Sequence, residues 1–109
     1  MTVAEIYEMI GSTGIECAYR EFPEGSGQEP PFICFTMPGG DDLFADNENY
    51  VKISRLVIEL YTDERDFALE NTVEEMLKEN NLTYTWDEDY IDTEHMHVTV
   101  YETEVLVDA

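Results

Sequence analysis

The sequence predicts an α+β fold, a single domain of residues 1–109 in which two helices pack on one side of a mainly antiparallel sheet. Two segments carry apolar residues at helical spacing, and five runs have the apolar or alternating character of strands. The expected order is αβββαββ, without the strict strand–helix alternation of a parallel sheet. A chain of 109 residues holds one hydrophobic core and no second domain.

The first helix is expected over residues 3 to 12. Thr2 and Glu5 have the spacing of a capping box, in which a hydroxyl and a carboxylate satisfy free amides at a helix start. Gly14 is expected to terminate the helix. The apolar stripe consists of Val3, Ile6, Tyr7 and Ile10.

Three strands follow, over residues 17 to 22, 31 to 37 and 50 to 62. The second is apolar throughout, as expected of a strand covered on both faces. The third gives the strongest strand signal, and its alternation defines two faces. One face is formed by Leu56, Ile58 and Leu60, and the other by Ile53, Val57 and Tyr61, interrupted by Arg55 and Glu59.

The second helix is expected to begin after Asp63 or Asp66, either of which can cap it, and to run to about Glu79. Asn80 and Asn81 end it, because asparagine tolerates the left-handed conformation of a helix stop. The predicted buried stripe is Phe67, Val73, Met76 and Leu77. The predicted solvent side is Glu70, Glu74, Glu75 and Glu79.

The last third predicts a hairpin with a three-residue turn over residues 92 to 94. This register sets Trp86 opposite Val100 and Tyr90 opposite Met96, which gathers large apolar groups on one face. A two-residue turn is rejected here because it sets acidic residues against apolar ones, Asp89 and Asp87 against Val98 and Val100.

The charge balance is strongly acidic, with 5 basic and 26 acidic side chains and a formal net charge of -21. Phosphate binding needs a basic surface, so this balance argues against direct binding of nucleic acid or of anionic membranes. No window resembles a membrane span and no leader segment is recognisable, so we expect the protein in the cytosol. Mimicry of DNA by carboxylates at phosphate spacing is a further reading, although the acids are scattered along the chain.

No catalytic, cofactor or metal motif stands out, and an enzyme is not expected. Cys17 and Cys34 are far from CxxC spacing and are read as reduced buried thiols on neighbouring strands. His95 and His97 are two apart on a predicted strand, on the face opposite Trp86, but zinc needs further ligands. We expect a solvent-facing histidine pair with a carboxylate nearby.

The segment PGGDDLFADNEN, residues 38 to 49, is the strongest candidate site. Its acidic residues do not keep the alternating spacing of a calcium-binding loop, so the simplest interpretation is a long solvated connection between strands. The apolar pair Leu43 and Phe44 at an acidic loop tip costs solubility unless it is covered, either by the chain's own core or by a neighbouring subunit. The predicted protein interface comprises Asp41, Asp42, Leu43, Phe44, Asp46 and Tyr50.

Nearly the whole chain, from residue 29 to 106, resembles a family of small proteins encoded in prophages and tailed phages of Gram-positive bacteria. The matching residues are Pro30-Pro31, Phe44-Ala45-Asp46, Ile58-Glu59-Leu60-Tyr61-Thr62, Leu69-Glu70, Val73-Glu74, Tyr90-Ile91 and Tyr101-Glu102. The resemblance implies a component of the head-to-tail region, most directly a tail terminator, also called the tail completion protein. Such proteins have no catalytic residues.

The resemblance also implies the partners. A tail terminator forms a homo-oligomer, usually a six-membered ring, that caps the tail tube protein and meets the head connector or head completion protein. DNA would pass through the ring without specific binding, and the protein would lie in the host bacterial cytoplasm during assembly and then in the virion. Another connector role, or an acidic DNA-mimic inhibitor, stays open at this point.

Overall fold

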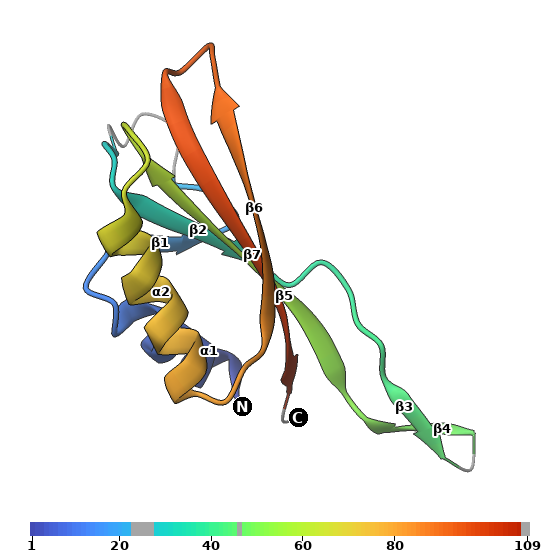
Figure 1. The fold of residues 1–109 in the computed structure, drawn as a ribbon. Coiled ribbons are helices and arrows are strands. Elements are labelled where there is room, and N and C mark those ends of the chain that lie inside the picture. Colours follow the sequence, from blue (N-terminus) through green and yellow to red (C-terminus); the bar gives the residue numbers. More distant parts are fainter. Residues whose placement is uncertain (23–27, 46, 108–109) are drawn as a thin grey trace.

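The computed structural model describes residues 1–22, 28–45 and 47–107. The elements are α1 (Val3–Gly11), β1 (Cys17–Tyr19), β2 (Phe32–Thr36), β3 (Leu43–Ala45), β4 (Glu48–Val51), β5 (Ile53–Thr62), α2 (Phe67–Glu79), β6 (Tyr84–Ile91) and β7 (Met96–Leu106). Figure 1 shows α1 and α2 on the same face of the main sheet. The predicted α+β class and helix placement are therefore confirmed.

The main sheet has the strand order β1-β2-β5-β7-β6. Its neighbouring pairs are antiparallel except β1 and β2, which run parallel. The core lies between this sheet and the helices, and the opposite face has no helix over it (Figure 1). The main residues of the core are Ile6, Met9, Ile10, Ile33, Phe35, Leu56, Ile58, Leu60, Val73, Met76, Leu77, Tyr101 and Val105.

Both helix starts follow from local capping. In α1 the Glu5 N–H donates to Thr2 Oγ1 at 3.1 Å while the Thr2 N–H donates to Glu5 Oε1 at 3.0 Å, so the predicted capping box is present. Of the two predicted caps of α2, the structure selects Asp66, whose side chain accepts from the Leu69 N–H at 3.1 Å. Asn81, with φ 59°, follows the end of α2 as predicted.

Two assignments on α2 are wrong. Glu70, predicted on the solvent side, is only 5% exposed, because it lies on the buried stripe and meets Arg65. Phe67, predicted in the buried stripe, is 69% exposed, because it is the first residue of α2 and its ring contacts Arg65 rather than the core. The remaining stripe residues, Val73, Met76 and Leu77, are buried as predicted.

The predicted register of the last hairpin is also wrong. Residues 92 to 95 form a four-residue turn, with His95 in the left-handed conformation at φ 52°. Trp86 therefore lies opposite Tyr101 and Tyr90 opposite His97. The pairing of Asp87 with Val100 and Asp89 with Val98, rejected from the sequence, is the one observed. No helix of the described residues covers that face, and Asp87 and Asp89 stay exposed at the edge of the sheet although Val98 is buried.

The cysteines lie on neighbouring strands, as predicted. Ala18, not Cys17, is the partner of Cys34 in the parallel register, so the two thiols point to opposite faces of the sheet. Both are free, and burial raises the pKa of the Cys34 thiol to about 11.

The predicted strand over residues 50 to 62 is two strands, β4 and β5, separated at Lys52. With β3, β4 forms a two-stranded ribbon that projects away from the domain (Figure 1). The radius of gyration is 15.0 Å, above the roughly 13 Å of a compact chain of this length. The expected loop is therefore a protruding arm.

Candidate functional site

The arm, residues 39 to 51, exposes apolar side chains on a ribbon that contacts little else. All three residues of β3 are exposed, Leu43 at 56% and Phe44 at 74%. Among the described residues, β3 and β4 pair only with each other, and the register shifts between Leu43 and Phe44. The sequence left two ways to cover this apolar pair, by the chain's own core or by a neighbouring subunit. The structure excludes the first, because both side chains are exposed.

The base of the arm is well defined by backbone hydrogen bonds to β5. The Arg55 N–H donates to Gly39 O at 2.7 Å, and the Asp41 N–H donates to Ile53 O at 2.9 Å. The Asp42 carboxylate accepts from the Ile53 N–H at 3.0 Å. A Cβ at Gly40 would collide with the Ile53 carbonyl oxygen, so only glycine fits this approach.

The predicted interface residues divide between the base and the ribbon. Asp41 and Asp42 lie at the base, and Leu43 and Phe44 lie in β3. The backbone of Tyr50 lies in β4, whereas Asp46 lies outside the described residues. The described members therefore all lie on the arm or at its base.

The histidines do not form the predicted solvent-facing pair. His95 lies in the turn, whereas His97 is 7% exposed and shares the helix-side face with Trp86. Among residues 1–22, 28–45 and 47–107, no group of three or more His, Cys, Asp or Glu side chains is placed to hold a metal ion. Within the same ranges, neither helix has the length and apolar content for crossing a membrane.

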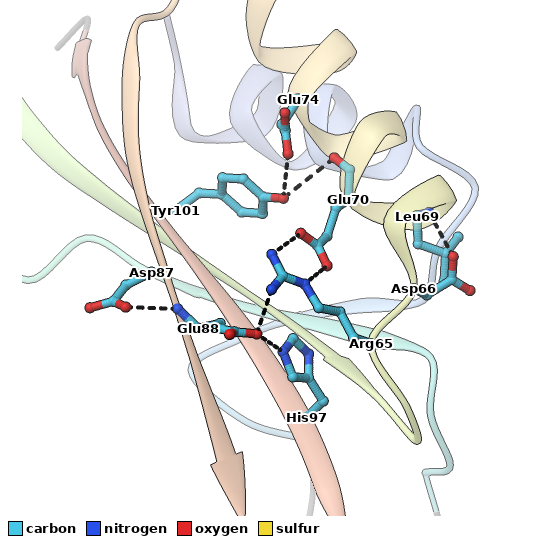
Figure 2. A network of polar contacts seen from close by, with 9 residues as sticks. All are labelled: Arg65, Asp66, Leu69, Glu70, Glu74, Asp87, Glu88, His97 and Tyr101. Carbon is cyan, nitrogen blue, oxygen red and sulfur yellow. Dashed lines mark hydrogen bonds and ion pairs between the residues drawn. The ribbon is translucent and has the colours of Figure 1, made fainter.

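A polar network that the sequence analysis missed joins α2 to the β6–β7 hairpin (Figure 2). Arg65 binds buried Glu70 through two hydrogen bonds, of 3.1 and 3.3 Å, and lies 2.8 Å from Glu88 through Nη1. His97 Nε2 contacts the same Glu88 oxygen at 2.8 Å. The available signal was a glutamate on the buried stripe of a helix in a chain with few basic residues.

These contacts determine the ionisation of the network. The hydrogen bond from His97 and the charge of Arg65 lower the pKa of Glu88 below its ordinary value. Deeper in the fold, Tyr101 donates to Glu74 at 3.0 Å, and burial raises the pKa of its hydroxyl. Glu88 is thus held as a carboxylate, whereas Tyr101 stays a neutral donor.

Three aromatic side chains are exposed on the elements that form the network: Phe67 at 69%, Trp86 at 56% and Tyr90 at 50%. The Arg65 guanidinium carbon lies 4.6 Å from the Phe67 ring centroid and 5.5 Å from that of Trp86. These are cation–π distances, so the ion pairs that order Arg65 also support two exposed rings.

No protein-family model matches the chain, and no curated protein sequence is significantly similar to it. Among solved structures, a chain of the virion of a native gene transfer agent particle is similar, with a TM-score of 0.62 and 13% sequence identity. The match covers 93% of this chain and 91% of that chain. The two chains share a fold over almost their whole length.

Proposed function

We propose that this protein is a structural component of a phage virion, which acts through protein–protein contacts and catalyses no reaction. The observation that carries the proposal is the shared fold with a virion chain, because the match covers almost all of both chains. A protruding arm with exposed apolar residues supports it, since such a surface suits a contact with another subunit.

Within this class, we propose the role of tail terminator. The resemblance of residues 29 to 106 to small tailed-phage and prophage proteins supports this narrower assignment. In this role, several copies form a ring on the finished tail tube and meet the head connector. The arm is the intersubunit contact, with Leu43 and Phe44 as its apolar anchors.

The acidity of the chain suits a ring through which DNA passes. Carboxylates repel phosphates, so a formal charge of -21 per copy opposes adhesion of DNA to the ring. The same charge opposes the approach of two copies. Ring closure is therefore expected to strengthen with salt, which screens the repulsion over about 8 Å at physiological ionic strength.

The test is electron microscopy of particles made by the encoding phage or prophage after deletion of this gene. Filled heads beside unjoined or overlong tails are the expected result, and a plasmid copy of the gene should restore joined particles. Tails of normal length without joined heads would favour another connector role. Normal infectious virions would exclude an essential role in virion assembly and shift attention to a DNA-mimic inhibitor.

A further inference from the structure

The outer edge of β6 is a second surface suited to a partner, at a different part of the molecule from the arm. β6 is an edge strand of the main sheet, and among the described residues only β7 pairs with it (Figure 1). It is eight residues long, and its six central residues are exposed. An exposed edge of this length is a template for an additional strand.

Two backbone donors on this edge are occupied by neighbouring carboxylates. The Glu88 N–H donates to Asp87 Oδ1 at 2.8 Å, and the Tyr90 N–H donates to Asp89 Oδ1 at 2.8 Å (Figure 2 shows the first). In an antiparallel ladder, alternate residues point their backbone groups away from the partner strand. Asp87 and Asp89 therefore cover donors that an incoming strand would use.

The two faces beside this edge differ in chemistry. On the helix side, Trp86 and Tyr90 are exposed, and Trp86 and Phe67 both contact Arg65. On the other side, Asp87 and Asp89 point away from the helices, as their pairing with Val100 and Val98 requires. Successive side chains of a strand also alternate between faces. A strand added here would place every second residue on the face of Trp86 and Tyr90, where Glu88 between them is already paired with Arg65 and His97, and the others beside Asp87 and Asp89.

We propose that the β6 edge binds an extended segment of a partner protein in which basic and apolar residues alternate. The basic residues pair with Asp87 and Asp89 and draw these carboxylates away from the Glu88 and Tyr90 N–H groups. The freed donors then bond the carbonyl groups of the incoming strand, and its apolar residues pack on Trp86 and Tyr90. Aromatic anchors of this kind dominate the energy of many protein interfaces.

A second copy of this chain is a poor occupant of the same edge. Two β6 edges would bring the Asp87–Glu88–Asp89 run of each copy together, and facing like charges are destabilising. The chain has only 5 basic side chains against 26 acidic ones. Charge complementarity therefore favours a basic partner over self-association.

The experiment uses the isotope-labelled full chain and a synthetic peptide of four Lys-Val repeats, in about 0.15 M salt to screen diffuse attraction. We expect the peptide to shift the NMR signals of the Glu88 and Tyr90 amides and the Trp86 indole, and to slow exchange of both amides. A block peptide of four lysines followed by four valines has the same composition and charge but lacks the alternation. It should bind at least about tenfold more weakly.

Two double variants provide the matched test. Asp87→Asn with Asp89→Asn removes two charges from the edge and should weaken binding about tenfold. Glu102→Gln with Glu104→Gln removes two charges from the same sheet face but in β7, an interior strand, and should leave binding unchanged. Equal binding of the two peptides, equal losses in both variants, or signal shifts away from β6 would overturn the proposal. Self-association through β6 without peptide would also overturn it.

Discussion

The arm and the junction between α2 and the β6–β7 hairpin both expose aromatic rings, yet they are held in different ways. Phe44 on the arm is 74% exposed and Phe67 at the junction is 69% exposed. At the junction, Arg65 contacts Glu70, Glu88 and two rings. The arm beyond its base is held by the β3–β4 ladder alone, among the described residues.

The two regions are therefore expected to contribute differently to the stability of the domain. An isolated two-stranded ribbon is at best marginally stable in water, so the arm beyond its base contributes little to the stability of the domain, and a partner that covered it would order it. The junction contains a buried carboxylate that needs its counter-charge, so it contributes to stability without a partner. Changes at the junction should therefore affect folding, and changes on the arm beyond its base should affect assembly.

The largest expected effect is that of Arg65→Ala. Glu70 is 5% exposed, so loss of the guanidinium leaves a buried charge without compensation. We expect a clear fall in the free energy of unfolding, measured by urea denaturation. Arg55→Ala, which removes an exposed arginine from β5, is the control and should cost about 0.5 kcal/mol or less. Equal losses would mean that only the net charge matters.

Gly40→Ala is the next largest and probes the base of the arm. Its methyl group would meet the Ile53 carbonyl oxygen, which is fixed backbone. We expect a loss of about 1–3 kcal/mol, read from the denaturation midpoint. Gly39→Ala is the neighbouring control, because its methyl group meets only the Arg55 guanidinium, which can move. A Gly40→Ala protein as stable as Gly39→Ala would contradict the observed pairing at the base.

A smaller effect concerns acid stability at the junction. The pKa of Glu88 is lowered in the folded state, by the His97 hydrogen bond and then by Arg65. A group of this kind stabilises the fold above its unfolded pKa, and this stabilisation is lost as the pH falls through the folded pKa. Glu88→Gln should therefore be less stable than the native chain at pH 7, and the difference should shrink below the ordinary pKa of 4.5.

Urea denaturation at several pH values measures this difference. Glu102→Gln removes a carboxylate from the uncovered face of β7 and is the control for net charge. Its difference from the native chain should not follow the same course. A pH-independent difference for Glu88→Gln would show that the contacts of Glu88 do not depend on its charge.

The sequence predicts well what local rules determine. The Thr2–Glu5 capping box, the alternation of Leu56, Ile58 and Leu60, and a cap of α2 by Asp63 or Asp66 all depend on neighbours in the chain, and all were predicted. The hairpin register failed because the choice assumed that a valine needs an apolar partner. On an uncovered sheet face that assumption does not hold.

The missed parts of the site depend on contacts between distant segments. Arg65 and Glu70 are close in the chain, but Glu88 and His97 reach them only through the observed register of β6 and β7. β3 was read as part of a loop because it is only three residues long and all three are exposed, so it has no alternating apolar face. Asn47, in the left-handed conformation at φ 63°, is the remaining local signal of a turn there.

The smallest expected effect on stability, combined with a large effect on assembly, is that of Phe44→Asp. Phe44 is 74% exposed and covers no core, so the free energy of unfolding should change by about 0.5 kcal/mol or less. If the arm is the intersubunit contact, a charge at its apolar anchor should prevent the variant from restoring joined particles in the deletion phage. Leu106→Asp, at 60% exposure outside both regions, adds the same charge and should restore them.

Full restoration by Phe44→Asp would refute the arm as the contact, even if the deletion itself gives overlong tails. An unfolded Phe44→Asp monomer would instead show that the arm belongs to the folding unit, and the contrast between the two regions would then be wrong.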